Sequence, residues 1–567
     1  MTETTAPITE NSRAKTAARI GWAILILATL YVCYFSHLGA IGFVGPDEPR
    51  YAWIARDMAE TRDWVTPRLY GKPWFEKPPL FYWGAAISFK VFGVSEAAAR
   101  LPSAISALLA TLALAWLALR LYGAETARWL LLLLPTTVGM VGFSHAAATD
   151  MPFSGMLTIA MIGAAVVLGL ARNKNSPVIP QTPWLALILF GFFLGLAVLA
   201  KGPAAIILSG GAIFFWALFT KRWRDAFRLF HPAALASFCL SALPWYILCA
   251  RRNPDFFRIF IIEHNFKRYL TPEFQHIQPF WYYGPVLLVA FFPWIPLLLW
   301  TVVAGTRHLL HTKTASPATT FLLTWSSFCV AFFSTSHSKL PGYILPAFPA
   351  IALLLSHSCF SPIIANRKAS GATLFLFAGL ALITAMVLNG IHVHAIRDFE
   401  MVKFAGLALL ALVLVTNALL GWAFLCRDKT TIRNLLIALS PVPVLAVLLF
   451  AGKPLAALDR NWLSSRGVAN EIQLHAIPFD KLSVRGYESR GWRYGLNFYL
   501  HRQIDDWNPN SNAEAFVLSG GRHCNLVRTA TQDCSEISLD SDEAGWWVLH
   551  VSPKSSADSH PRSGQPH

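Results

Sequence analysis

The sequence predicts an all-α polytopic membrane protein of roughly thirteen transmembrane helices, followed by a small α/β domain at its C-terminal end. Two observations predict the helical part: 55% of the 567 residues are hydrophobic and only 14% are charged, against about 25% charged in soluble domains. A third observation predicts the extra domain, because the chain turns polar after about Lys453 and contains short strand-like pieces.

The expected spans are apolar runs bounded by charges or turn residues. The first follows a polar N-terminal tail and has no cleavage site after it, so it is interpreted as a transmembrane helix and not as a signal peptide. The spans lie near residues 18–38, 98–120, 128–145, 151–171, 184–200, 203–219, 232–250, 280–303, 318–335, 342–358, 370–389, 402–425 and 434–451.

The charge pattern predicts the orientation. If residues 1–17 are a cytoplasmic tail, every cytoplasmic connection is basic, as the positive-inside rule requires; examples are Arg222, Arg367 and Arg433. The net charge of +16 is therefore spread over short loops, which argues against nucleic-acid binding. We expect a multi-pass protein of the bacterial inner membrane with its chemistry on the periplasmic side.

Domain boundaries follow from this topology. Residues 18–452 form the transmembrane domain, with a long outer loop at residues 42–95 in which Pro79–Phe92 is expected to lie as an amphipathic helix in the interface. Residues 453–552 form the periplasmic domain, with strands at Leu482–Val484 and Trp546–Val551, and residues 553–567 form a disordered tail. Cys524 and Cys534 are either disulfide-bonded or two free thiols.

Two acids are candidate catalytic residues because ionisable groups near membrane depth are costly. Asp47 follows Gly45-Pro46 at the exit of the first span and is placed to act as a general base toward a hydroxyl or phosphate acceptor. A turn or capping role is the alternative, since Gly-Pro-Asp favours turns. Asp150 lies at an outer helix end in the same topology.

Several cations gather on the same outer side and predict a bound anion. Arg50, Lys77, Arg268 and Lys339 would repel one another unless a lipid phosphate lay between them, although surface ion pairs are the alternative for each one. The loop from Arg251 to Leu270 holds five basic residues on the side where few are expected. Tyr343 is expected to contact the substrate or to anchor the interface.

Glu76 and His264 are candidate metal ligands, because carboxylate and imidazole groups suit zinc or manganese. No compact ligand motif accompanies them, so a divalent metal stays one of two interpretations. Neither a P-loop nor a dinucleotide-binding glycine motif is present.

Five segments carry a resemblance: GPDEPRYA, FEKPPL, ATDMPF, EHNFKRYL and KLPGYILP, in that order. Together they resemble the bacterial lipid A aminoarabinose transferases, within the wider superfamily of protein O-mannosyltransferases with the GT-C architecture. The resemblance implies an enzyme that moves a sugar, with inversion, from an undecaprenyl-phosphate donor to lipid A or a related envelope acceptor. It implies that Asp47 and Asp150 are catalytic, that Arg50, Lys77 and Arg268 bind the carrier phosphate, and that Glu76 and His264 hold a metal.

Other functions stay open at this stage. A protein O-mannosyltransferase-like enzyme and a ligase using diphosphate-linked donors are enzymatic alternatives, and a lipid-linked sugar transporter is the non-enzymatic one. A transporter is expected to carry its charged residues near the bilayer midplane, whereas here they gather at one interface. The sugar, the acceptor, the metal and the oligomeric state are not determined by the sequence.

Overall fold

The structure, a computed structural model, divides into two compact units. The helical unit comprises Met1–Leu38, Met58–Pro67 and Pro73–Ala451, and the mixed unit comprises Gly39–Asp57, Arg68–Lys72 and Gly452–His567. The structure describes residues 8–171, 183–267, 277–312, 315–360, 371, 374–375, 378–379, 399–425, 430–459, 464–485, 489–508, 513–519, 532–539 and 547–553.

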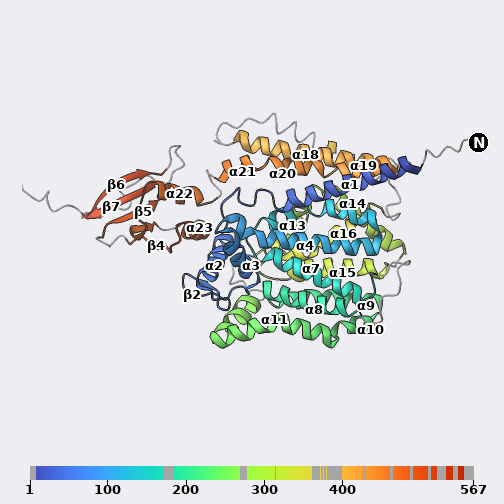
Figure 1. Cartoon of the computed structure of the whole chain (residues 1–567), viewed down its shortest axis with the longest axis horizontal. Helices are drawn as coiled ribbons and strands as arrows, with labels where there is room; N and C mark the ends of the chain where they lie inside the picture. The colour runs from blue at the N-terminus through green and yellow to red at the C-terminus, as the bar shows by residue number, and fades with distance from the viewer. Residues whose placement is uncertain are drawn as a thin grey trace, which may run out of the picture. The chain divides into compact units, whose positions relative to one another are not determined.

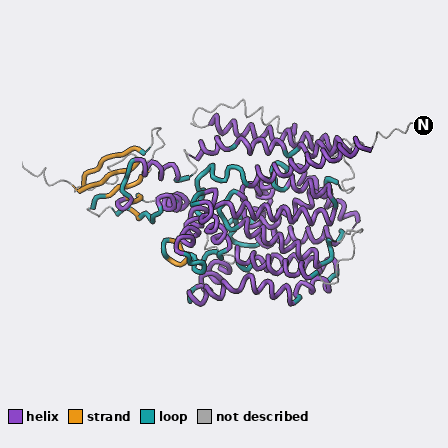
Figure 2. The backbone as a smooth tube through the Cα atoms, viewed as in Figure 1, coloured by secondary structure: helices purple, strands orange, loops and turns teal. Residues whose placement is uncertain are grey.

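The helical unit is built from α-helices and a few short 3₁₀- or π-helical segments, labelled η (Figures 1 and 2). In chain order these are α1 (Ile8–Tyr34), α3 (Leu80–Phe92), α4 (Glu96–Tyr122), α5 (Ala124–Leu133), α6 (Val138–Ser144), α7 (Asp150–Val167), α8 (Trp184–Lys201), α9 (Ala204–Thr220), α10 (Trp223–Phe227), η1 (Arg228–Phe230), α11 (Pro232–Arg252), η2 (Arg258–Lys267), η4 (Phe280–Tyr282), α13 (Tyr283–Ala290), α14 (Ile295–Thr312), α15 (Pro317–Ser334), η5 (Pro341–Ala347), α16 (Phe348–Ser358), α18 (Phe399–Leu425), α19 (Thr430–Leu439) and α20 (Val442–Phe450).

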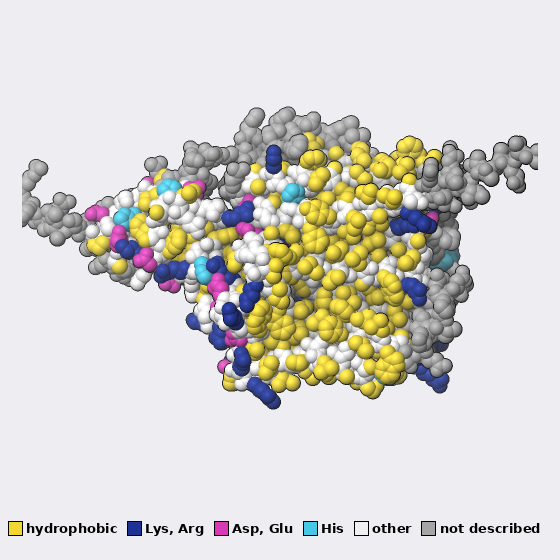
Figure 3. Space-filling model, in the orientation of Figure 1, with side chains coloured by type: hydrophobic (Ala, Val, Ile, Leu, Met, Phe, Trp, Pro, Cys, Tyr) yellow, Lys and Arg dark blue, Asp and Glu magenta, His cyan; other side chains and the backbone are white. Residues whose placement is uncertain are grey.

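Among the described residues, seven helices are long and apolar enough to cross a membrane, or eight if the bent pair α5–α6 is one span. Hydrophobic side chains cover the face of these helices that Figure 3 shows, and Leu240 and Leu310 are among the most exposed. A water-exposed surface of this kind would be unfavourable, so the chain is a multi-pass membrane protein. The predicted span at residues 370–389 falls mostly outside the described residues.

Two predicted spans are interrupted where the sequence suggested continuous helices. The span at 128–145 is the pair α5 and α6, bent by 63°, and the span at 280–303 is α13 and α14. The two breaks are bonded to each other: the Val138 N–H donates to the Phe292 carbonyl at 3.0 Å and the Trp294 indole donates to Thr136 at 3.2 Å. Irregular backbone is tolerated inside a bilayer when protein groups satisfy it in this way.

Helix α7 lies at the centre of the helical unit, and 83% of its residues are buried. Small residues allow neighbouring helices to approach it, because a Cβ at Gly155 would lie 2.9 Å from the Ser106 carbonyl of α4 and one at Gly163 would lie 3.0 Å from the Phe190 amide of α8. The rigid setting of α7 fixes its first residue, Asp150, at one end of the bundle.

The mixed unit contains a five-stranded sheet of order β4-β3-β5-β7-β6. Strand β3 is parallel to β4 and β5, whereas β7 is antiparallel to β5 and β6. Its elements are β1 (Arg68–Leu69), β2 (Lys72–Pro73), α21 (Gly452–Leu458), α22 (Arg466–Leu474), η7 (Phe479–Lys481), β3 (Leu482–Val484), α23 (Arg490–Leu500), β4 (Asp505–Asp506), β5 (Ala515–Ser519), β6 (Gln532–Ser538) and β7 (Trp547–Pro553).

The two predicted strands are confirmed as β3 and β7. Both place apolar side chains in the core of the mixed unit, where Leu482, Leu518 and Val548 are buried together with Ile472 of α22. Cys534 on β6 is disulfide-bonded, and Cys524, the other cysteine of the two alternatives, lies outside the described residues.

Helix α2 (Asp47–Thr61) was not foreseen, because its residues lie in the long outer loop. The helix begins with two acids, which suit the positive end of the helix dipole. Tyr51, Ala52, Ile54 and Ala55 are all buried, at a spacing typical of one helical face.

Candidate active site

Asp150 forms an ion pair with Lys201 in the helical unit. Asp150 opens α7 and Lys201 closes α8, so the pair joins two helices at the same end of the bundle. The Lys201 side chain is only 10% exposed and that of Asp150 is 21% exposed. A cation this sheltered needs its carboxylate, because an unpaired charge away from water is strongly destabilising.

Aromatic rings complete the setting of Lys201. Its ammonium lies 4.7 Å from the centre of the Tyr343 ring and 5.6 Å from that of Phe153, within the range of cation–π attraction. Tyr343 belongs to η5, whose Gly342 passes so close to Asp150 that a Cβ there would lie 2.6 Å from the carboxylate oxygen. The structure therefore brings Asp150 and Tyr343 together, as two of the predicted site residues.

Lys339 is buried just before η5 and bonds to backbone. Its ammonium donates to the Gln278 carbonyl at 2.9 Å and to the Ser336 carbonyl at 2.5 Å, and Ile277 pairs with Ser338 in a β-bridge. Desolvation lowers the pKa of Lys339. The lysine thus fastens two loops together and keeps a third N–H for another acceptor.

Glu76 and Lys77 lie half-buried between β2 and α3. The residue before them, Phe75, anchors this segment in an aromatic cluster with Trp245 of α11 and with Phe256, and the Phe75 and Phe256 rings meet edge to face at 5.3 Å. Phe256 leads into the π-helical segment η2, which carries His264. The Glu76 segment and the His264 segment are therefore packed against one cluster.

The arginines of the loop after α11 are partly neutralised by acids. Arg258 bonds to Glu263 at 2.6 Å and to Asp255 at 3.2 Å, and Arg252 lies 3.2 Å from Asp63. These pairs account for part of the basic excess without a phosphate. Arg268, the predicted phosphate ligand of this loop, lies outside the described residues.

The metal site predicted at Glu76 and His264 stays a prediction. Within the described ranges, no group of three His, Cys, Asp or Glu side chains could hold a metal ion. A zinc site usually takes at least three protein ligands, so Glu76 and His264 by themselves do not make one.

In the mixed unit, Asp47 opens α2 and pairs with Arg50 one turn later at 2.5 Å. The Asp47 side chain is 48% exposed, whereas that of Arg50 is 11% exposed. The Arg50 guanidinium lies over the rings of Tyr51 and Tyr494, at 5.3 and 5.7 Å from their centres. Arg50 is thus held in place on the protein side, and Asp47 keeps an accessible carboxylate.

A tight hairpin supports the same region. Tyr70 and Gly71 connect β1 and β2 with positive φ angles of 52° and 76°, a conformation that is costly for tyrosine. The Tyr70 hydroxyl accepts a hydrogen bond from Asn497 at 2.8 Å, and its ring meets Trp53 of α2 at 4.8 Å. Burial raises the pKa of Tyr70 to about 12.

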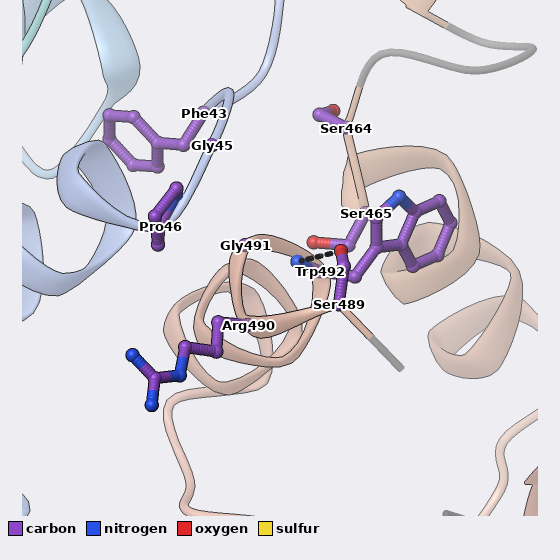
Figure 4. A pocket seen from close by; sticks show the side chains of 9 residues that line it. All are labelled: Phe43, Gly45, Pro46, Ser464, Ser465, Ser489, Arg490, Gly491 and Trp492. Carbon is purple, nitrogen blue, oxygen red and sulfur yellow. Dashed lines mark hydrogen bonds between the residues drawn. The ribbon is translucent and has the colours of Figure 1, made fainter. Parts of the chain in front are cut away.

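Beside the Gly45-Pro46-Asp47 turn lies a cavity of about 240 Å³. Figure 4 shows Phe43 and Pro46 on one side of it, and Ser465, Ser489 and Trp492 on the other, with Arg490 extending away from the serines. Gly491 lets α23 approach the turn, because a Cβ there would lie 2.8 Å from the Gly45 carbonyl carbon. We name this the serine–tryptophan cavity; its lining is Phe43, Gly45, Pro46, Ser464, Ser465, Ser489, Arg490, Gly491 and Trp492.

Sequence reasoning missed Lys201 and the serine–tryptophan cavity. Lys201 is not among the predicted site residues, although a lysine that ends a fully apolar run is itself a signal of a buried partner. The serines carry no comparable signal, because they meet Phe43 only through the fold.

The sequence of the chain is similar to those of known proteins. Residues 19–260 match the family of dolichyl-phosphate-mannose-protein mannosyltransferases. The chain is 31% identical over 413 residues to the undecaprenyl phosphate-alpha-4-amino-4-deoxy-L-arabinose arabinosyl transferase of Aeromonas salmonicida, which covers 71% of this chain and 73% of that protein. The same-named protein of Serratia proteamaculans is 30% identical over 423 residues, covering 72% of this chain and 74% of that protein.

The fold is similar to a solved structure as well. Apo ArnT from Cupriavidus metallidurans superposes with a TM-score of 0.74 at 22% identity, covering 94% of this chain and 98% of that one. Bundle, mixed unit and matched family together define a membrane-embedded glycosyltransferase of the GT-C type. Within that class, the chain belongs to the family of undecaprenyl phosphate-alpha-4-amino-4-deoxy-L-arabinose arabinosyl transferases.

Proposed function

We propose that this enzyme transfers 4-amino-4-deoxy-L-arabinose from undecaprenyl phosphate to lipid A or a related envelope acceptor. The donor and sugar are those named for its relatives, and a related structure is bound to undecaprenyl phosphate. The observation that carries the proposal is the accessible carboxylate of Asp47 beside the serine–tryptophan cavity.

Asp47 is the proposed base. In the transfer, an acceptor oxygen attacks the anomeric carbon of the sugar, the bond from that carbon to the phosphate oxygen breaks, and undecaprenyl phosphate leaves. A carboxylate next to the attacking oxygen orients it and takes its proton where the acceptor is a hydroxyl. The short ion pair with Arg50 limits the positions that the Asp47 carboxylate adopts.

The carrier phosphate is the proposed ligand of Lys77, Arg268, Lys339 and Tyr343, and the same role stays a prediction for Arg50. The leaving phosphate gains negative charge as the sugar departs, so fixed cations stabilise the transition state more than the ground state. Lys339 has a third N–H beyond its two carbonyl contacts. Asp150 is proposed to act through Lys201, whose ammonium it fixes against the Tyr343 ring.

The serine–tryptophan cavity is the proposed subsite for a sugar ring. Its serine hydroxyls suit the hydroxyl groups of a sugar, and the Trp492 indole offers an apolar face. A volume of about 240 Å³ suits a single sugar ring better than a whole lipid headgroup.

A divalent metal at Glu76 and His264 stays a proposal. Among the described residues no group of three or more His, Cys, Asp or Glu side chains could hold a metal ion, so we derive no step through a metal. Likewise proposed are the thirteen spans, the inner-membrane location, the periplasmic site and the periplasmic domain at residues 453–552.

The function is tested with purified full-length protein in liposomes. Undecaprenyl phosphate-linked 4-amino-4-deoxy-L-arabinose and lipid A are supplied, and mass spectrometry follows the sugar on lipid A. We expect transfer from this donor and none from its diphosphate-linked counterpart. Transfer only from the diphosphate donor, or transport without any product, would overturn the proposal.

The subsite is tested in the same assay with Trp492→Ala. Loss of the indole is expected to raise the KM of a sugar-bearing substrate about tenfold while changing kcat little. The control is Trp422→Ala, because Trp422 is an exposed tryptophan of α18 in the helical unit. Equal KM values for the two variants would remove the sugar subsite from the proposal.

A further inference from the structure

The connection between α9 and α11 is an amphipathic elbow that sugar transfer does not explain. It consists of α10 and η1, Trp223 to Phe230. Phe227 is 66% exposed and Phe230 is 68% exposed, while the residue before each of them, Ala226 and Leu229, is buried. A short segment with exposed aromatic rings and several arginines is typical of a membrane interface.

This elbow overhangs a cavity of about 530 Å³ formed with α8, α9 and α11. Among its lining residues are Phe190 of α8, Gly210 and Phe214 of α9, Phe227 of α10 and Leu235 of α11. Phe214 and Leu235 are 50% and 47% exposed, so the cavity opens on the outer, hydrophobic surface of the helical unit. Figure 1 shows α10 at the end of the bundle away from α3.

The packing of the helices explains why the cavity exists. Helix α8 meets α11 so closely that a Cβ at Gly191 would lie 2.1 Å from the Ala234 carbonyl. Helix α9 instead packs against α15, where a Cβ at Gly211 would lie 2.1 Å from the Phe328 ring. Because α9 and α11 are bound to different partners, a gap remains between them beneath the elbow.

The side chains that line the cavity suit an apolar ligand. Its one side-chain hydroxyl, that of Ser209, donates within its own helix to the Ala205 carbonyl at 2.8 Å. Apart from the Trp223 indole N–H, the other lining side chains are hydrocarbon, and hydrocarbon is what fills an apolar gap that faces lipid. An empty gap would lose the van der Waals contacts of its walls.

The elbow and the residues just before it are basic. They carry Lys221, Arg222, Arg224 and Arg228 and a single acid, Asp225, which leaves an excess of three positive charges. Arg222 serves the fold: it bonds to Asp225 at 2.7 Å and to the Leu168 carbonyl at 3.0 Å. Arg228 lies 3.2 Å from the same acid, and Lys221 and Arg224 are exposed.

We propose that this is a binding site for one anionic phospholipid, with an acyl chain in the cavity and the phosphate at Lys221 and Arg224. Because lipid tails gain little by exchanging hydrocarbon for protein, the fixed charges make the site selective. The site is distinct from the Asp150 site: α9 starts three residues after Lys201 and ends at the elbow, where the Trp216 indole bonds to Pro317 at 2.9 Å.

The test is native mass spectrometry of the full-length protein released from micelles that contain palmitoyl-oleoyl phosphatidylglycerol or the matching phosphatidylcholine. We expect one phosphatidylglycerol to be retained in preference. Lys221→Gln and Arg224→Gln should each weaken this retention about fivefold. Arg307→Gln, a basic control on α14, should leave it unchanged.

The chain position is tested by filling the cavity. A side chain at Gly210 meets nothing within 4 Å, so Gly210→Phe is expected to fold and to abolish preferential retention, and Gly210→Leu to reduce it. Gly305→Phe on α14, also in open space, is the matched control. Equal retention of both lipids, retention undiminished in Gly210→Phe, or stronger retention of added undecaprenyl phosphate would each overturn the proposal.

Discussion

Asp150 and Asp47 are both paired with a cation, but the Asp47 carboxylate is much more exposed than that of Asp150. Each acid opens a helix and pairs with a cation. The partner of Asp47 comes from the same helix and leaves the carboxylate 48% exposed. The partner of Asp150 comes from another helix, and the acid is 21% exposed under η5.

The difference teaches which acid is free to react. A carboxylate that ties two helices together and fixes a sheltered lysine cannot leave that lysine without a large energetic cost. A carboxylate held only by its neighbour one turn away can approach a substrate while the pair persists. This difference supports the proposed base role of Asp47 and the proposed positioning role of Asp150.

The largest expected effect is that of Asp47→Asn, which keeps the shape and removes the base. Loss of general-base catalysis is expected to lower kcat by about 10²–10⁴-fold with little change in thermal stability. The transfer assay measures kcat, and Asp506→Asn is the control, because Asp506 is an exposed acid paired with Arg493 in the same unit. Turnover within a factor of a few of wild type would break the comparison.

Next in size is Lys201→Met, which leaves Asp150 without its cation. The free energy of unfolding is expected to fall by about 3 kcal/mol, measured by denaturation in mixed micelles. Replacing both partners, as Lys201→Met with Asp150→Leu, should restore most of that loss. Arg252→Gln, which breaks the exposed pair with Asp63, should cost less than about 1 kcal/mol. A double variant no more stable than the single one would contradict the tie between helices.

Two glycines sharpen the contrast between the sites. Gly342→Ala would press a methyl group on Asp150, and Gly491→Ala would press one on the Gly45 turn. Each is expected to cost about 1–3 kcal/mol. We expect Gly491→Ala to raise the KM of the substrate, because it changes the serine–tryptophan cavity. We expect the main effect of Gly342→Ala to be a lower free energy of unfolding. Gly305→Ala, with open space around it, should be neutral or slightly stabilising.

The smallest expected effect is that of Tyr70→Phe, which removes the hydrogen bond from Asn497 and should cost about 1 kcal/mol. The pKa of Tyr70 is raised from 10.0 to about 12 in the folded chain. Its contribution is therefore complete below pH 10 and is lost as the pH rises through 12. An alkaline stability scan should show a smaller loss in Tyr70→Phe than in wild type, whereas Tyr31→Phe, exposed on α1, should match wild type.

Much of the helical unit was predictable because hydropathy is a local signal. Runs such as Trp184–Lys201 and Pro317–Ser334 appear as single helices close to the predicted bounds. The breaks near Thr136 and Phe292 were not predictable, because averaging over an apolar run conceals a bend that tertiary hydrogen bonds support. Helix α2 was missed for the opposite reason: its acids and arginines resemble a loop, although its buried residues follow helical spacing.

The candidate site was predictable only in part. The sequence identified Asp47, Arg50 and Asp150 as residues of interest, because charged groups beside apolar runs are costly, and Tyr343 because it lies close to Lys339 in the same segment. Which of them pair depends on contacts between distant segments, such as Asp150 with Lys201 across 51 residues. The catalytic, phosphate-binding and metal-binding roles of all the predicted site residues stay predictions.

The bond between Trp294 and Thr136 also constrains how the chain is made. The indole is synthesised 158 residues after the hydroxyl that it binds, so the α5–α6 bend enters the bilayer before its support exists. A ribosome-bound chain ending before residue 294 must leave that bend incompletely bonded. The bend between α5 and α6 therefore reaches its final hydrogen bonding only after the segment that contains Trp294 has been inserted.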